Sequence, residues 1–194
     1  MISGIDITLD TLKKIRSDFK GYIHLDAHNI VMTTYPDGRR LQGPIDDWFE
    51  WCTNCNTLQM NETELNIMTQ EKLSEEEIAD EILINEVNKT NALAVTRGKG
   101  GVSLYIPNAS TPLSIERLDI RAIENHRFKD STGCGDVFGA GFFYKNALSA
   151  QRDYIENMKF GNRLASAKSK LLGVEDMVNL QHIFSPLLKG EQNI

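Results

Sequence analysis

The sequence has few of the features that would direct a chain to a membrane, to the cell exterior or to nucleic acid. No apolar run approaches the roughly 20 residues of a membrane-spanning helix. Residues 1–6 lack the basic and apolar regions of a signal peptide. Three cysteines, an odd number, give no disulfide framework. The 21 basic and 27 acidic residues leave a net charge of −6, which argues against a broad basic face for nucleic acid. We therefore expect a cytoplasmic protein with no membrane or nucleic-acid partner.

The chain is long enough to bury a hydrophobic core, and its elements alternate. At 194 residues with 41% hydrophobic residues, we expect one domain over residues 1–194. The residue patterns predict helices at 8–19, 46–54, 74–88, 133–150, 154–172 and 177–188, and strands at 22–26, 57–60, 92–96 and 102–106. Residues 33–44 are expected to be a loop, and residues 107–127 a loop with a short strand. Strands that alternate with helices predict a layered α/β fold with a mainly parallel sheet.

The stretch 130–144 begins with small polar residues and then becomes apolar, as at the start of a helix. Ser131 or Thr132 could cap that helix, and Gly133 and Gly135 would leave its first backbone N–H groups accessible to an anion. Asp136 would repel a phosphate bound there, unless its carboxylate accepts the proton of a hydroxyl that attacks the phosphate. The alternative is a tight helix entry that packs closely on a sheet and has no chemical role.

Three other patterns have structural explanations. His24, Asp26 and His28 would share one face of a strand, which permits a metal site but is commoner as ordinary polar contacts. The Cys52–Cys55 pair has no second pair for zinc and ends a helix, so neither a zinc site nor a redox motif is favoured. The glycine-rich turn at 98–101 is not followed by a helix or by Ser or Thr after its Lys, so it is not a Walker A loop.

The residues at 61–64 also fit a plain helix start. Asn61 would cap a helix, with Glu64 at its third position, which is the spacing of a capping box. Oxygen donors such as these also suit Mg²⁺. The two interpretations are compatible, because the same side chains can serve both.

Residues 130–136, Asp-Ser-Thr-Gly-Cys-Gly-Asp, resemble the C-terminal signature of the ribokinase-like (PfkB) carbohydrate kinases, usually Asp-Thr-Thr-Gly-Ala-Gly-Asp. Upstream, residues 61–64 resemble the family's Asn-x-x-Glu motif, and residues 95–101 resemble its nucleotide-side strand and turn. Residues 162–173 resemble the helix that borders the adenine. The resemblance covers essentially the whole chain but only the second half of the family's domain. It implies a three-layer ribokinase-like fold that lacks the N-terminal half and the lid.

The resemblance implies transfer of the ATP γ-phosphate to a hydroxyl of a sugar or a nucleoside-like small molecule. Asp136 would be the general base, and the backbone N–H groups of Gly133, Cys134 and Gly135 would bind the phosphoryl group in transfer. Glu64 and Asn61 would act through Mg²⁺.

The resemblance also implies a nucleotide side to the site. Thr96, Arg97, Gly98 and Asn162 would contact ATP. Thr132 and Asp130 would shape the phosphate loop, and in some relatives the Asp130 region also holds a monovalent cation.

Two departures from the family pattern stand out. Cys134 replaces Ala, and a thiol at the positive end of a helix dipole is expected to have a lowered pKa and to be sensitive to alkylation. The missing half leaves three functions open. They are a kinase, a nucleotide-binding regulatory or degenerate module, and a structural partner that forms a homo-oligomer through an exposed sheet edge.

Overall fold

The computed structural model divides into two compact units, and each is considered by itself. The first comprises Met1–Arg97 and Ser103–Asp119, and the second Gly98–Val102 and Ile120–Ile194. The structure describes residues 1–3, 7–70, 72–84, 90–111, 113–124, 126–149, 152–173, 175–179, 182 and 184–185.

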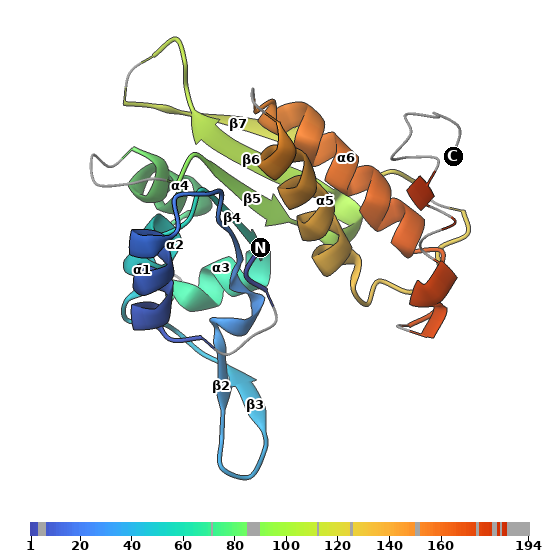
Figure 1. Cartoon of the computed structure of the whole chain (residues 1–194), viewed down its shortest axis with the longest axis horizontal. Helices are drawn as coiled ribbons and strands as arrows, with labels where there is room; N and C mark the ends of the chain where they lie inside the picture. Colours follow the sequence, from blue (N-terminus) through green and yellow to red (C-terminus); the bar gives the residue numbers. More distant parts are fainter. Residues whose placement is uncertain are drawn as a thin grey trace. The chain divides into compact units, whose positions relative to one another are not determined.

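A five-stranded sheet forms the centre of the first unit (Figure 1). Its order is β1-β4-β5-β6-β7, with β1 at His24–Asp26, β4 at Thr57–Asn61, β5 at Ala92–Thr96, β6 at Val102–Pro107 and β7 at Ile115–Ile120. Strands β1, β4 and β5 are parallel, and Leu58 pairs with Leu25 on one side and Leu93 on the other. The expected α/β fold with a mostly parallel sheet is confirmed.

The outer edge of β1 carries a short parallel bridge to Ile2. The Ile2 N–H donates to the His24 carbonyl over 2.8 Å, and the Asp26 N–H donates to the Ile2 carbonyl over 2.9 Å. This edge is therefore partly paired, where the sequence suggested a bare one.

Four helices share one hydrophobic core with this sheet. They are α1 at Leu9–Asp18, α2 at Trp48–Thr53, α3 at Glu62–Met68 and α4 at Glu75–Leu83. The side chains of Thr8, Asn61 and Ser74 cap α1, α3 and α4, because each accepts a hydrogen bond from a backbone N–H of the first turn. Residues 85–89, the end of the helix expected at 74–88, lie outside the described part of the chain.

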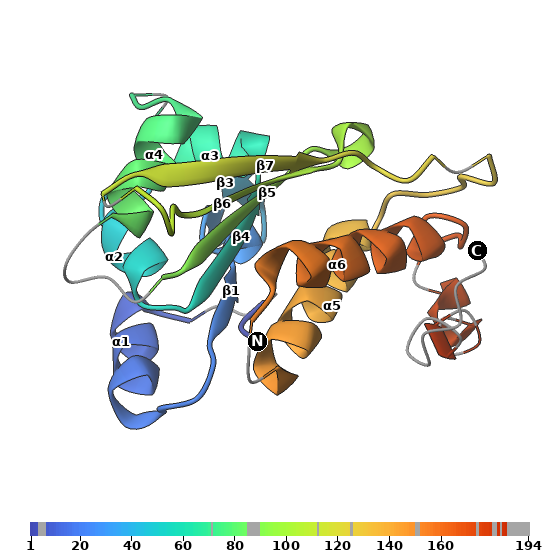
Figure 2. The same ribbon diagram turned by 90° about the horizontal axis from the view of Figure 1, so that it is seen from above.

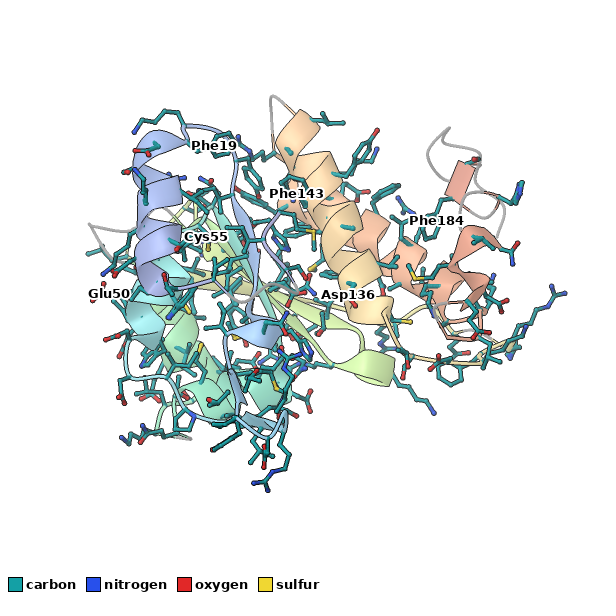
Figure 3. All side chains as sticks on the ribbon, turned by 60° about the horizontal axis from the view of Figure 1, so that its bottom comes forward. Phe19, Glu50, Cys55, Asp136, Phe143 and Phe184 are labelled. Atoms are coloured by element: carbon teal, nitrogen blue, oxygen red, sulfur yellow. The ribbon has the colours of Figure 1, made fainter. Side chains whose placement is uncertain are left out.

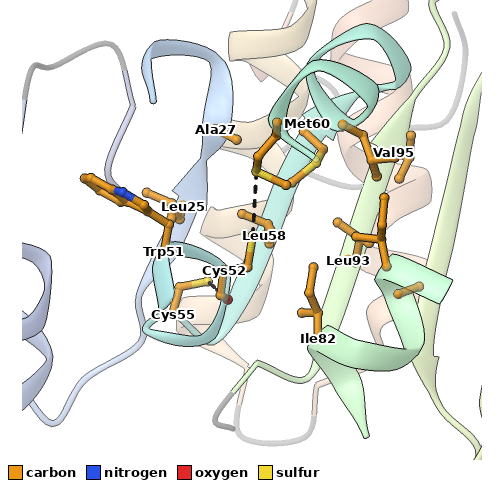
Figure 4. Packing of buried hydrophobic residues seen from close by; sticks show 14 of the residues in the cluster. Leu25, Ala27, Trp51, Cys52, Cys55, Leu58, Met60, Ile82, Leu93 and Val95 are labelled. Atoms are coloured by element: carbon orange, nitrogen blue, oxygen red, sulfur yellow. Dashed lines mark hydrogen bonds between the residues drawn. The ribbon is translucent and has the colours of Figure 1, made fainter. Parts of the chain in front are cut away.

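The cysteines at the end of α2 belong to this core (Figure 4). The Cys55 thiol donates to the Cys52 carbonyl over 3.3 Å, and both side chains are buried. Burial raises the pKa of both thiols, that of Cys55 to about 12. Across the described residues, no three His, Cys, Asp or Glu side chains gather as they would around a metal ion. His24 and Asp26 lie in β1, whereas His28 lies in the 3₁₀ turn Ala27–Asn29, so the expectation that the three share one face of a strand is wrong.

The loop expected at 33–44 is instead an antiparallel hairpin, with β2 at Met32–Thr34 and β3 at Arg40–Gln42. Its turn closes when the Gly38 N–H, at a φ of 84°, donates to the Tyr35 carbonyl over 2.9 Å. The strands are largely exposed, so they lack the apolar alternation by which a strand is recognised.

In the second unit, helices α5 at Cys134–Leu148 and α6 at Tyr154–Lys168 pack side by side (Figure 2). Small residues bring them together: a Cβ on Gly161 would lie 2.8 Å from the Phe138 carbonyl oxygen. A buried amide pair crosses the same interface, because the Asn157 side chain donates to that of Asn146 over 3.0 Å. Gly141 of α5 makes a matching close approach, because a Cβ there would lie 2.6 Å from Leu164 Cδ1.

Two helix ends differ from the expectation. Helix α6 stops at Lys168, four residues before its expected end at residue 172. The helix expected at 177–188 begins as a 3₁₀ turn, Glu175–Asn179, and most of its remainder lies outside the described residues. None of the helices in the described ranges combines the length and apolar character that crossing a bilayer requires.

The α5–α6 contact predicts that Gly161→Ala destabilises the protein, although alanine is the better helix former. We expect a loss of about 1–3 kcal/mol, since the new methyl group must displace the Phe138 backbone. Urea unfolding followed by circular dichroism measures it. Gly43→Ala is the control, because a Cβ there meets nothing within 4 Å. Equal stability of Gly161→Ala and the parent would contradict the close approach.

His24 predicts a pH-dependent stability. It is buried, with Nδ1 2.9 Å from the Thr57 hydroxyl, and burial lowers its pKa to about 3. An unfolded histidine titrates near 6.5, so below that pH the unfolded chain binds a proton that the folded chain excludes. His24 therefore stabilises the fold fully above pH ~6.5, and this stability is lost as the pH falls towards 3, by up to about 1.4 kcal/mol per pH unit.

Urea unfolding between pH 7 and pH 4.5 tests this dependence. We expect His24→Asn to flatten the slope of stability against pH by close to one proton. His126→Asn, at an exposed histidine, should leave the slope unchanged. A parent slope that survives in His24→Asn would show that other groups cause it.

Candidate phosphate loop and nucleotide cavity

The loop before α5 is capped by its backbone rather than by a side chain. Gly133 is the N-cap residue, with a φ of 76° that favours glycine, so the cap expected from Ser131 or Thr132 is wrong. The Thr132 hydroxyl donates instead to Asp130 Oδ1 over 2.9 Å.

The Asp130 carboxylate ties this loop to the chain that follows α6. Its Oδ1 accepts the Thr132 N–H, and its Oδ2 accepts the Gly173 N–H, both over 2.9 Å. These hydrogen bonds, those from Thr132 first, lower the pKa of Asp130. The Lys129 N–H adds a bond of 2.8 Å to the Ser169 carbonyl. The start of the loop is therefore tied to Ser169 and Gly173, which both follow α6.

Asp136 lies in the first turn of α5, at the end where the loop enters (Figure 3). Its side chain is exposed, and within the described ranges it forms no hydrogen bond or ion pair. Of the three backbone donors expected, Cys134 already donates its N–H to the Ser131 carbonyl over 3.0 Å. A free carboxylate thus stands beside the positive end of a helix.

A cavity of about 700 Å³ opens within the second unit, against the same loop. Ser131 and Cys134 line it from the loop, and Phe128 and Ile123 supply exposed apolar surface. The full lining is Gly98, Lys99, Ala122, Ile123, Glu124, His126, Phe128, Ser131, Cys134, Asn162, Ala165, Ser166 and Ser169. Its size and mixed lining are typical of sites for small ligands.

Two of the expected nucleotide contacts, Gly98 and Asn162, line this cavity. The Asn162 amide donates to the Arg121 carbonyl over 2.8 Å, which fixes its orientation. Lys99 lies with Nζ 5.7 Å from the centre of the Phe128 ring. The turn at 98–101 therefore reverses the chain and also places the positive charge of Lys99 at the cavity.

Thr96 and Arg97 belong to the first unit. Thr96, the last residue of β5, pairs in register with Asn61 of β4. Arg97 forms ion pairs with Glu62 and Glu75 and donates to Ser103 over 3.0 Å. The Glu75 side chain is accordingly only 16% exposed, although it lies in the acidic first turn of α4.

The candidate metal residues form the expected capping box in the first unit. The Glu64 N–H donates to Asn61 Oδ1, and the Asn61 N–H donates to Glu64 Oε2, both over 2.8 Å. The other Glu64 oxygen lies 2.7 Å from His28 Nδ1, and the Glu64 side chain is only 3% exposed. A carboxylate offers about four lone-pair sites, so Glu64 retains acceptor capacity for metal-bound water. This arrangement fits a hydrated Mg²⁺, which keeps several of its waters.

Comparison with models of known protein families shows to which family the chain belongs. The model of the pfkB family carbohydrate kinases matches residues 27–178. The chain belongs to the pfkB family. A comparison with curated protein sequences found no match.

Solved structures of the ribokinase family share the fold. A ribokinase from Thermotoga maritima superposes with a TM-score of 0.62 at 23% identity, over 86% of this chain and 48% of its own. A Burkholderia thailandensis nucleoside kinase, solved with inosine, gives 0.60 at 17%, over 85% and 46%. A pyrophosphate-dependent kinase, solved with a pyrophosphate analogue and myo-inositol, gives 0.62 at 14%, over 86% and 54%. The chain spans about half the length of these relatives.

Cys134 departs from the usual pfkB signature, and its expected reactivity is not supported. Its thiol is half-buried, and this burial raises its pKa, although the charge of Lys168 opposes the shift. The expectation of a lowered pKa at the helix start is therefore wrong.

Three contacts at or near these sites were not anticipated from the sequence. His28 contacts Glu64, Phe128 lines the cavity, and Lys168 is buried beside Gly133. A lone aromatic in a polar loop was an available signal for Phe128. For Lys168 there was none, because a lysine near a helix end normally reads as a solvated charge.

The raised pKa predicts that iodoacetamide labels Cys134 no faster than free glutathione at pH 7. Peptide mass spectrometry of the native chain measures the rate, and the urea-unfolded chain is the control. The buried Cys52 and Cys55 should remain unlabelled in the native chain. Labelling of native Cys134 faster than glutathione would contradict the raised pKa and support the earlier expectation of a reactive thiol.

Proposed function

We propose that this chain is the C-terminal part of a pfkB kinase domain, over residues 1–194, and that its site transfers the γ-phosphate of ATP to a hydroxyl of a sugar or nucleoside-like molecule. The observation that carries the proposal is the free carboxylate of Asp136 on a helix N-terminus, next to a nucleotide-sized cavity that ends on the same loop.

Asp136 acts as the general base. An alcohol must lose its proton as it attacks phosphorus, and a carboxylate without a partner can accept that proton. The backbone around Gly133 and Gly135 faces the charge that develops on the phosphoryl oxygens, and Cys134 contributes through the turn that its N–H closes. Thr132 and Asp130 keep the loop in shape.

The cavity is the site for the nucleotide. Ile123 and Phe128 offer apolar surface to a purine ring, while Asn162 and Lys99 supply polar and charged groups. Pyrophosphate has no part that would use an apolar wall, so the lining favours ATP over pyrophosphate as donor. Gly98 borders the nucleotide from the cavity wall. Arg97 stabilises the end of β5, at Thr96, through its ion pairs.

Mg²⁺ is the metal that these residues suit. Glu64 and Asn61 would hold it through its waters, and the ion would offset the negative charge of the donor phosphates. The acceptor class rests on the relatives: a ribokinase, a nucleoside kinase with inosine and a kinase with myo-inositol all point to polyhydroxyl compounds.

A nucleotide-binding module without transferase activity is the second candidate. The cavity and the loop, which lie together within the second unit, favour it, because nucleotide binding alone requires neither an acceptor nor the exclusion of water. The cavity and the loop would serve nucleotide binding in either case.

Asp136→Asn should lower phosphotransfer by about 10²–10⁴-fold while MgATP affinity changes little, because the base acts in the transition state. Calorimetric titration gives the affinity, and ADP release with a panel of sugars, polyols and nucleosides gives the turnover. Glu156→Gln, in the first turn of α6, is the matched control and should leave both unchanged.

The outcomes separate the candidates. Equal turnover in the parent and Asp136→Asn would refute the base assignment. MgATP binding without turnover of any acceptor would leave the nucleotide-binding module. Absence of binding would refute both.

A further inference from the structure

Lys168, the last residue of α6, is fully buried, with 0% of its surface exposed. Its ammonium nitrogen has no hydrogen-bond partner among the residues that the structure describes. A buried ammonium without partners is costly, because it loses its hydration. Lysine is therefore rarely found in such a place unless its charge is used.

The lysine lies against the phosphate loop. A Cβ added at Gly133 would stand 3.7 Å from Lys168 Cε and 3.9 Å from Asp136 Oδ2, so the loop glycine separates the two side chains. The charge of Lys168 acts on the Asp130 carboxylate and on the Cys134 thiol. All of these residues belong to the second unit.

The same lysine is turned away from the cavity. The wall that α6 gives to the cavity consists of Asn162, Ala165 and Ser166, followed by Ser169 just beyond the helix, and Lys168 is not part of it. Its charge therefore reaches the site from within the protein, behind the loop, where screening by salt is weak.

A monovalent cation in the Asp130 region, which the family resemblance implied, does not fit this arrangement. A second positive ion beside a buried ammonium would be strongly repelled at low dielectric. Three of the roughly four lone-pair sites of the Asp130 carboxylate are also engaged already, two by Thr132 and one by Gly173.

We propose that the Lys168 ammonium is a built-in cation of the phosphate loop and takes the place of a monovalent metal ion there. It offsets the charge of Asp130, holds the 130–136 loop against the end of α6, and adds positive potential behind the helix N-terminus. The benefit to a bound phosphoryl group rests on the proposed function, whereas the holding of the loop does not. Lys168 is in this sense a positioning residue.

The test is the dependence of the unfolding temperature on the cation. At constant ionic strength, the parent chain should unfold at the same temperature in potassium, ammonium and choline chloride. Lys168→Ala removes the charge and leaves space, so it should unfold at least about 3 °C lower in choline and recover in potassium or ammonium. Lys168→Met fills the space without charge and should be destabilised in all three salts.

Lys170→Ala is the matched control, since it removes a charge two residues away that is not buried. It should show neither the loss nor the recovery. A selective rise of the parent's unfolding temperature in potassium would overturn the proposal. The proposal would also be overturned if neither potassium nor ammonium raised the unfolding temperature of Lys168→Ala, or if that variant were unfolded in every salt. A Lys168→Met variant as stable as the parent would overturn it as well. No nucleotide or acceptor is present, so the result stands whether or not the chain is a kinase.

Discussion

The site in the second unit depends on one carboxylate, that of Asp130. It joins two segments that are 43 residues apart in sequence, through Thr132 on one side and Gly173 on the other. Together with the Lys129 N–H bond to the Ser169 carbonyl, it sets the left-handed turn at Gly133 relative to the end of α6. The position of Asp136 follows from that turn, because the turn sets where α5 begins. A loop of small residues thus obtains part of its fixed position from an acid that need not take part in the proposed chemistry.

The packing of α5 against α6 brings the Asp130 carboxylate close enough to bond to the chain that follows α6. Gly161 and Gly141 let the two helices approach closely, and Asn146 and Asn157 pair where they are buried. The end of α6 then lies within reach of the loop that precedes α5, so Ser169 can accept from Lys129. Small residues inside helices lower helix propensity, and here they set the distance between two helices that carry the site.

The sequence predicted most of the elements, and the physical reasons for its misses are specific. Buried strands such as β4 and β5 are marked in the sequence by apolar runs, and helices such as α3 are marked by their capping residues. The hairpin β2–β3 is exposed on both faces and so has none. The buried state of Lys168 depends on α6 meeting the Gly133 loop, a contact between distant segments that residue type cannot reveal. Cys134 was misjudged because the helix dipole was considered without the burial that opposes it.

The second unit contains the cavity, the phosphate loop and Asp136 within itself, whereas Asn61 and Glu64 lie in the first. In the proposed function, donor binding would draw on α5, α6 and their loops. Transfer would additionally require Asn61, Glu64 and an acceptor. Proposed donor binding and proposed phosphotransfer are for this reason separable properties, which can be measured independently.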